Sequence, residues 1–330
     1  MNENTFEPVA PLSPEYKDRH TGLVFFGIVT VLMGCVAGLF VLLMLVGPMA
    51  TARAGQPATP LKMLLPTMAT YAFLAVALIW LGIGSTLARR WARALILIFS
   101  WCWLIIGVWT MAFMAYLMPK MFANMPVGAA SGQQQGMFQV IMIVTMVFMA
   151  GLFIVLPAIW VAFYGGRNVK ATCEARDPVP RWTDATPLPV LGLCLFLAFS
   201  AVMMLAMALA GPWPLPLFGA IATGIPATLS ALAVAAAWAY AAWALYKLEL
   251  RGWWVTVIVI LLFGISSALT FAHHSITEMY SQMNIPAAQI EQIQKTGLFT
   301  GNGMVWMSIA WMVPFLGYVI FVRKYFRAAA

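Results

Sequence analysis

The stretch PRWTDATPLPVLG at residues 180–192 ends the longest charged interruption of the chain and opens a long apolar run. A stretch of the same order, PEYKDRHTGLVFFG at residues 14–27, opens the first apolar run. In both, a proline comes two residues before an aromatic residue and four before an aspartate. The two runs end in Gly47-Pro48 and Gly211-Pro212. We therefore predict two copies of one unit, joined by residues 168–179.

The composition places both copies in a membrane. Of the 330 residues, 63% are apolar and only 8% are charged, and the mean hydropathy is +0.90. Soluble domains carry about 25% charged residues. The apolar runs are about 20 residues or longer, as a spanning helix requires, and they lack the alternation of barrel strands. We predict an all-α, polytopic transmembrane helix bundle.

Eight apolar runs are long enough to span the bilayer, and they divide evenly between the two copies. They cover residues 22–46, 63–87, 95–117, 137–164, 188–210, 215–245, 253–271 and 304–322. The first four-helix repeat is predicted at residues 14–167 and the second at 180–325, with tails at 1–13 and 326–330. Because each copy crosses four times, both start on the same side, so the repeats are parallel to each other.

Further matches between the copies support this division. Leu74-Ala75-Val76-Ala77 in the second run has a counterpart in Leu232-Ala233-Val234-Ala235 of the sixth run. The fourth and eighth runs contain Pro157 and Pro314, each followed by aromatic residues and then by a cation.

Lysine and arginine lie mostly on one side of the predicted spans. Of the 18 basic residues, 14 fall in the two tails and in the loops on the same side, and four fall on the opposite side. Cytoplasmic loops carry this excess, so both termini are predicted in the cytoplasm and the protein in the inner (plasma) membrane. The net charge of +8 is interpreted as this topology signal, not as a nucleic-acid surface.

The four cysteines do not indicate a disulfide framework. Cys35, Cys102 and Cys194 lie inside apolar runs, and Cys173 lies in a predicted cytoplasmic loop, where thiols stay reduced. Cys173 is interpreted as incidental; a reactive thiol beside the nearby cations is the alternative.

One set of candidate metal ligands stands at the outer end of the seventh run. His273 and His274, with Met279 and Met283 nearby, combine imidazole and thioether groups that suit copper. The alternative is that the histidines are ordinary interfacial residues and that the methionines cluster only because they are abundant. No other cofactor is predicted.

The repeated aspartates are interpreted as structural. Asp18 and Asp184 stand before apolar runs, where a carboxylate caps a helix N-terminus. With Pro14, Pro180 and Trp182 they form helix-start architecture, and paired catalytic acids are the alternative. No nucleophile triad, glycine-rich phosphate loop or paired-cysteine motif is visible.

The sequence favours a membrane subunit or scaffold of a larger complex, without visible catalytic chemistry. Its expected partners are membrane lipids and either other membrane subunits or a second copy of the chain. The first alternative is a transporter or channel for a small or apolar solute, with its path between the repeats. There, Pro157 and Pro314 would expose backbone carbonyls. None of the ten acids lies in a predicted span, which argues against carboxylate-coupled transport. The second alternative is a membrane enzyme acting on lipid or quinone.

Overall fold

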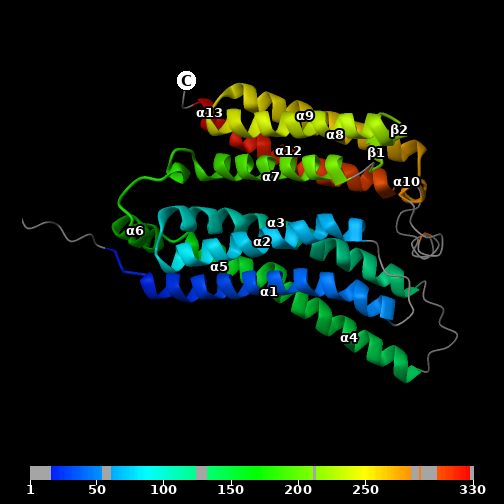
Figure 1. Ribbon diagram of the computed structural model, residues 1–330. Helices are drawn as coiled ribbons and strands as arrows, with labels where there is room; N and C mark the ends of the chain where they lie inside the picture. Colours follow the sequence, from blue (N-terminus) through cyan, green and yellow to red (C-terminus); the bar gives the residue numbers. More distant parts are fainter. Residues whose placement is uncertain are drawn as a thin grey trace, which may run out of the picture.

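A computed structural model describes residues 16–53, 61–123, 132–210, 213–283, 290 and 303–327. Almost all of these residues are helical, and the long helices lie in two groups (Figure 1). The first group contains α1 (His20–Arg53), α2 (Leu61–Thr86), α3 (Arg90–Ala123), α4 (Gly132–Ala150), the π-helical η2 (Gly151–Val155) and α5 (Leu156–Tyr164). The second group contains α7 (Leu188–Ala210), α8 (Gly224–Tyr246), α9 (Leu250–His273) and α12 (Gly303–Val322).

Short elements connect or flank these helices. Between the groups lie α6 (Arg167–Arg176) and the 3₁₀ turn η3 (Trp182–Asp184). The second group also includes the strands β1 (Leu215–Leu217) and β2 (Ala220–Ala222), and the helices α10 (Ile276–Gln282) and α13 (Lys324–Arg327).

Within the described residues, eight helical segments are long and apolar enough to cross a membrane, as the sequence predicts. They fit a multi-pass membrane protein. The beginning of α1 and the end of α13 lie at the same end of the bundle as α6 (Figure 1). We call this the joint end. The predicted tail at residues 1–13, Pro14 and the Gly211-Pro212 pair lie outside the described residues.

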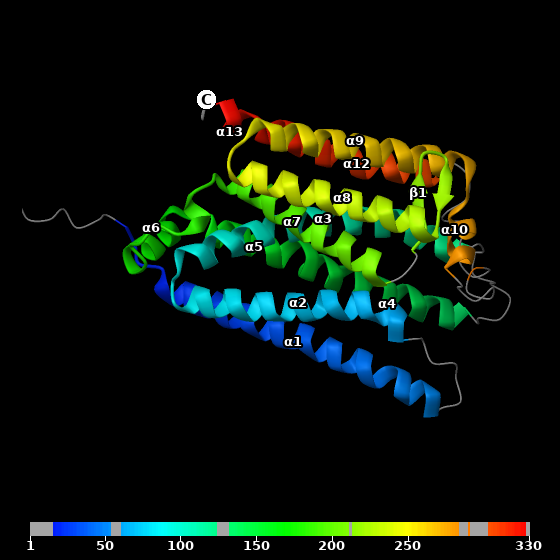
Figure 2. The same cartoon turned by 45° about the horizontal axis from the view of Figure 1, so that its top comes forward.

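The two groups are packed in the same order. In the first, α1 contacts α2, α2 contacts α3 and α3 contacts α5; in the second, α7 contacts α8, α8 contacts α9 and α9 contacts α12. The groups meet where α7 faces α2 and α3 (Figures 1 and 2). Aromatic contacts cross this boundary, with ring centroids 5.4 Å apart for Phe73–Phe199 and 5.2 Å apart for Trp109–Trp311.

The turn from α2 to α3 has the same backbone geometry as the turn from α8 to α9. Ala88 and Leu248 both adopt the left-handed conformation, with φ of 51° and 59°. Few residues other than glycine do so. The matched backbone hydrogen bonds are all 2.9 Å long: Ala88 to Ser85, Arg89 to Gly84, Leu248 to Leu245 and Glu249 to Ala244.

The pattern of buried residues agrees when the two groups are aligned on this turn, and it does not agree when they are aligned on the repeated Leu-Ala-Val-Ala sequence. Residues 81–87 and 241–247 have the same succession of buried and exposed positions, and Ala75 and Ala235 are both buried. The Leu-Ala-Val-Ala match would instead pair Ala75 with Ala233, which is exposed. The sequence match is thus two residues out of step with the structure, because small residues recur on several faces of α8.

Glycines bring α1 and α2 into close contact. A Cβ atom added to Gly82 would lie 2.6 Å from the carbonyl oxygen of Gly27, and one added to Gly34 would lie 2.9 Å from that of Ala75. Gly27 and Gly34 are two helical turns apart and share one face of α1. Larger side chains on this face would push the helices apart.

The predicted helix over residues 215–245 is wrong at its start, because β1 and β2 form a hairpin and α8 begins only at Gly224. Phe218 and Gly219 form its two-residue turn with φ of 45° and 93°, as type I′ turns require. Proline at positions 212, 214 and 216 opposes a helix in this segment.

The hairpin is held by hydroxyl groups of α9. Ser266 Oγ accepts a hydrogen bond from the Phe218 N–H and donates to the Pro216 carbonyl, both at 2.9 Å. Thr270 Oγ1 accepts from the Gly219 N–H at 3.1 Å. Both side chains are buried. The hairpin therefore uses the polar side chains of an otherwise apolar span.

The two span prolines have different effects. The fourth span is divided into α4, η2 and α5, and Pro157 stands in the first turn of α5 directly after the π-helical turn. A Cβ atom on Gly107 of α3 would overlap the carbonyl oxygen of Phe153 in that turn. Pro314 instead lies inside α12, which continues through it.

Candidate functional site

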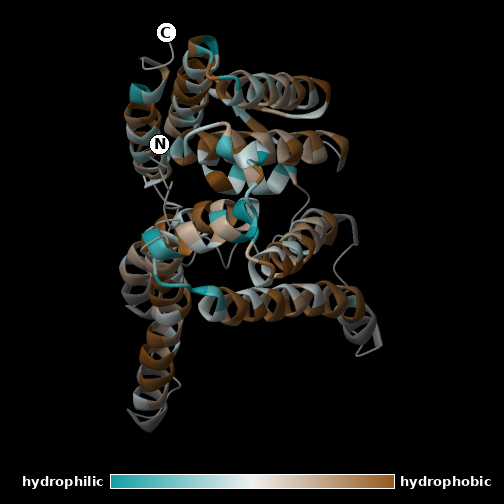
Figure 3. Cartoon of the chain, turned by 90° about the vertical axis from the view of Figure 1, so that its left-hand side faces the viewer, coloured by the Kyte–Doolittle hydropathy of each residue, from teal (hydrophilic) through white to brown (hydrophobic). Residues whose placement is uncertain are grey.

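The predicted linking loop at residues 168–179 contains the helix α6, which packs on the first group of helices. Val169, Thr172 and Cys173 are its buried side chains, and α6 contacts α1, α3 and α5. The Arg19 N–H donates to Thr172 Oγ1 at 3.0 Å, which connects α6 to the start of α1. Hydrophilic residues gather on this end of the molecule (Figure 3).

Cys173 does not have the surroundings of a reactive thiol. Its side chain is 1% exposed within the apolar cluster of the first group. Burial raises the pKa of the thiol to about 11, so the thiolate is scarce at neutral pH. This favours the interpretation of Cys173 as a packing residue.

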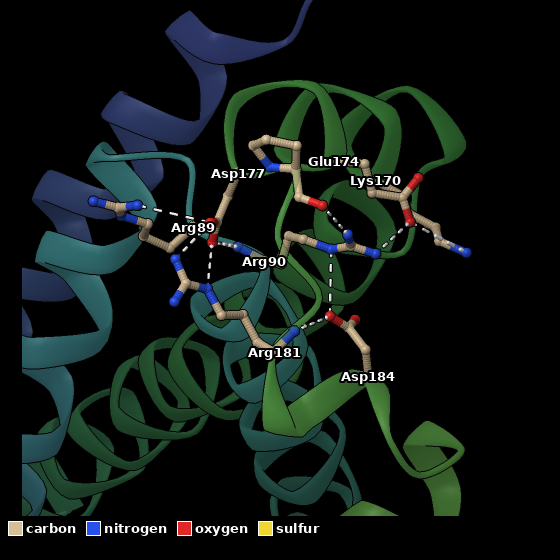
Figure 4. Close-up of polar contacts among 8 residues, drawn as sticks. Arg89, Arg90, Lys170, Glu174, Asp177, Arg181 and Asp184 are labelled. Atoms are coloured by element: carbon tan, nitrogen blue, oxygen red, sulfur yellow. Dashed lines mark hydrogen bonds and ion pairs between the residues drawn. The ribbon is translucent and has the colours of Figure 1, made fainter.

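A network of ion pairs lies between α6, η3 and the first turn of α3 (Figure 4). We call it the joint network; its members are Arg89, Arg90, Lys170, Glu174, Asp177, Arg181 and Asp184.

Asp177 is the buried carboxylate of the joint network, with a side chain that is 2% exposed. Arg181 donates to it twice, from Nη2 at 2.7 Å and from Nε at 3.2 Å. The Arg90 N–H donates at 3.3 Å, and Arg89 Nη1 lies 3.7 Å away. The hydrogen bond from Arg181 is the main cause of a lowered pKa of Asp177. The carboxylate thus caps the start of α3 from a distant part of the chain.

Arg90 occupies the centre of the network and contacts two further carboxylates. Its Nη2 lies 3.5 Å from Glu174 Oε1, and its Nε lies 3.3 Å from Asp184 Oδ2. Lys170 Nζ is 3.7 Å from the same Glu174 oxygen. These contacts fix the first turn of α3 against both α6 and η3.

The residues predicted as helix-start architecture lie at separate places on the joint end. Asp18 Oδ1 accepts from the N–H of His20, the first residue of α1, at 2.9 Å, and Arg176 donates to Asp18 Oδ2 at 3.0 Å. Asp184 accepts from the Arg181 N–H at 2.8 Å, at the start of η3. These contacts fit a structural role, which stays a prediction.

The remaining members of that predicted set differ in their surroundings. Pro180 and Trp182 are exposed, and Pro14 lies outside the described residues. The carbonyl of Trp182 accepts from the hydroxyl of Tyr246 at 3.1 Å, which ties η3 to the end of α8.

A pocket of about 200 Å³ lies beside the joint network. Its lining combines charged, polar and apolar residues: Arg90, Arg93, Ala94, Lys170, Cys173, Glu174, Thr183, Asp184, Thr186, Pro187 and Leu188. Two of the lining side chains have buried polar atoms for which the described part of the chain offers no hydrogen-bond partner, namely Nε of Arg93 and Oγ1 of Thr183.

The predicted copper ligands lie at the opposite end of the molecule. His273 is exposed, and Nδ1 of His274 lies 2.8 Å from Glu278 Oε2. Met279 belongs to α10, and Met283 follows its end. No group of three or more His, Cys, Asp or Glu side chains is placed for a metal ion in the described part of the chain. The copper site of histidine and methionine stays a prediction.

Sequence reasoning missed the roles of Asp177, Arg93 and Thr183. Arg93 lies before the predicted run at residues 95–117, but the structure has it in the first turn of α3, three residues after the start of that helix. The Arg89-Arg90-x-x-Arg93 spacing was the available signal, since a helix brings residues 90 and 93 onto one face. Asp177 gave no such signal, because its partners at positions 89 and 90 are distant in sequence.

No protein-family model matches the chain, and the comparisons with curated proteins and with solved structures found no match.

Proposed function

We propose that this multi-pass membrane protein is a membrane-embedded subunit or scaffold whose joint end binds a partner protein. The proposal rests on one observation. The charged surface of the joint end is held in place by ion pairs and hydrogen bonds, and apolar side chains are exposed beside it. The expected partner is another membrane subunit or a second copy of the chain.

The joint network holds this charged surface in one conformation. Ion pairs connect residues from α3, α6, η3 and the segment between α6 and η3. Several of the same side chains also donate to backbone or carboxylate oxygens. A surface that is already ordered loses less conformational entropy when a partner binds.

The apolar component is formed by Val179 and Trp182, whose side chains are 59% and 46% exposed. They flank Arg181, which pairs with Asp177. Tryptophan and arginine are enriched among the residues that dominate binding energy at protein interfaces. The combination suits docking of a protein surface.

Site-specific photo-crosslinking in cells tests this proposal. A photoreactive side chain at position 182 is expected to give a discrete crosslinked species of constant mass, which is then identified by mass spectrometry. The control is the same replacement of Trp306, which is 68% exposed on α12. Absence of any crosslink from position 182, together with a monodisperse monomer in mild detergent, would contradict the proposal.

We further propose that the chain consists of two fused four-helix repeats in parallel orientation, with both termini in the cytoplasm. The equal packing order of the two helix groups supports this, as does the shared left-handed turn at Ala88 and Leu248. The assignment of both termini to the cytoplasmic side rests on the excess of lysine and arginine at the joint end.

A transporter or channel is the second candidate, and the π-helical turn η2 favours it. Such turns leave carbonyl groups without the usual helical partner and often occur at functional sites. Gly107 lets α3 approach this turn closely. The solute path would then pass beside the interruption of the fourth span, within the first helix group, and not between the repeats as the sequence alone suggests.

Cysteine labelling distinguishes this candidate from the first. With the four native cysteines replaced, a cysteine at Gly151 is expected to react with a polar maleimide if water reaches η2. Gly317 is a suitable control, because both glycines lie in helical segments and neither would place an added Cβ near another atom. Equal protection of both positions would count against a solute path at η2.

A further inference from the structure

The pocket beside the joint network contains one cation for which no ion pair is found among the described residues. Arg90 pairs with Glu174 and Asp184, and Lys170 pairs with Glu174. Among the described residues, Arg93 forms no ion pair, and its Nε is buried without a hydrogen-bond partner. The lining therefore has three cations and two carboxylates, both of them already engaged.

Thr183 adds a second unsatisfied group to the lining of the pocket. Its side chain is 2% exposed, and Oγ1 has no partner among the described residues. A buried polar atom left unpaired costs about 1–3 kcal/mol. Because the two side chains line one pocket, a rotation of either side chain would present its unpaired group to a hydrogen-bonding ligand there.

The chemistry of the two groups defines the ligand. An arginine Nε–H can only donate, and a threonine hydroxyl can also donate. The pocket opens beside the first turn of α3, a 34-residue helix, whose N-terminal end carries partial positive charge. The donors and a cation that forms no ion pair of its own together select an oxygen-rich anion, although Asp177 already caps the Arg90 N–H at this helix end.

The size and position of the pocket favour a small group. Its volume of about 200 Å³ is below the about 300–1,000 Å³ of sites for drug-sized ligands. Two of its lining residues, Ala94 and Leu188, belong to the candidate spans of α3 and α7. This position, where apolar spans meet charged residues, is the depth at which phospholipid headgroups lie.

We propose that this pocket binds a phosphate group through Arg93 and Thr183, with Arg90 and Lys170 adding positive charge. The phosphate belongs either to a lipid headgroup or to a soluble ion. This site does not depend on the scaffold function, since it requires no partner protein.

The test uses the full chain in detergent and inorganic phosphate as the first probe. Binding is measured by titration at constant ionic strength against chloride, with the unfolding temperature as a second readout, because a bound ligand stabilises the folded state. Arg93→Gln is expected to weaken binding about tenfold or more, and Thr183→Val about threefold. Arg167→Gln removes an exposed cation of α6 outside the pocket and should leave binding unchanged.

A second arm separates the two sources of phosphate. The protein is extracted from vesicles of phosphatidylglycerol or of phosphatidylcholine, and retained lipid is measured by native mass spectrometry. Retention of phosphatidylglycerol by the parent chain but not by Arg93→Gln identifies a headgroup; binding of inorganic phosphate alone identifies a soluble ligand.

Two results would overturn the proposal. One is that the parent chain binds neither phosphate nor phosphatidylglycerol. The other is that Arg93→Gln and Thr183→Val bind both probes as the parent does. If Arg93→Gln does not fold, Thr183→Val alone decides, since it keeps the shape and removes only the hydroxyl.

Discussion

Asp177 is the residue on which the joint end depends most. It is buried, yet it accepts hydrogen bonds from Arg181 and from the start of α3, and it pairs with Arg89. Removing one partner of a buried charge cluster leaves the other charges uncompensated. Its replacement should therefore cost more than that of any exposed charge nearby.

We expect Asp177→Asn to lower the free energy of unfolding by about 2–3 kcal/mol. This is below the ~3–5 kcal/mol for a fully buried pair, because Arg89 and Arg181 are 42% and 37% exposed. Unfolding in detergent, followed by tryptophan fluorescence, measures the change. The matched control is Glu174→Gln, at a carboxylate that is 40% exposed, with an expected cost of about 1 kcal/mol or less. Equal effects of the two variants would contradict the prediction.

The same carboxylate should make stability depend on pH. Its pKa in the folded protein lies below the ordinary value of 3.8, so the unfolded chain binds the proton more readily. The stabilisation is therefore complete above pH 3.8 and is lost as the pH falls through the lower folded pKa. The difference in unfolding temperature between the parent and Asp177→Asn should shrink as the pH falls toward ~3. A difference that stays constant over this range would show that Asp177 does not titrate as expected.

At the scale of elements, the close contact between α1 and α2 depends on glycines, which have no side chain. Gly82 lies against the backbone of Gly27, so the two helices approach more closely than any larger residue would permit. Helix packing in membranes relies on such contacts, since lipid tails are as apolar as leucine.

We expect Gly82→Leu to destabilise the protein by about 1–3 kcal/mol or more, because the new side chain meets backbone that cannot move aside easily. Gly317→Leu is the control; an added Cβ there meets nothing within 4 Å, and the expected change is within about 0.5 kcal/mol. Thermal unfolding in detergent compares the two. Similar unfolding temperatures for both variants would show that the glycine contact is not required.

Elements also show where periodicity misleads. Residues 215–222 read as part of an apolar run, but Ser266 and Thr270 of α9 satisfy the backbone of a hairpin there. The short helix α6 was predicted as a loop, because its polar composition hid the buried Val169 and Cys173. Both errors occur where a distant element supplies the missing partners.

At the scale of the whole molecule, the joint end and the end that contains α10 face opposite ways (Figure 1). The distribution of lysine and arginine predicts that the joint end is cytoplasmic. Trp182 and His273 are exposed at the two ends, and each is a suitable position for a probe.

We expect a cysteine at position 182 to react with a membrane-impermeant maleimide only in inside-out vesicles. A cysteine at position 273 should react only in intact cells. The four native cysteines are replaced in both variants, and labelling after solubilisation is the control for reactivity. The reverse pattern would place the joint end outside the cell.

The sequence by itself determined the class of the protein and the number of spans. Apolar runs of sufficient length must be helical in a bilayer, because backbone groups have no other partner there. The tertiary structure alone decided how the charged residues of the joint are paired. Asp177 meets Arg89 and Arg90 only after α6 packs on α3, and the unpartnered atoms of Arg93 and Thr183 share a pocket only then. Side chains so far apart in sequence carry no common periodicity, so folding alone brings their charges together.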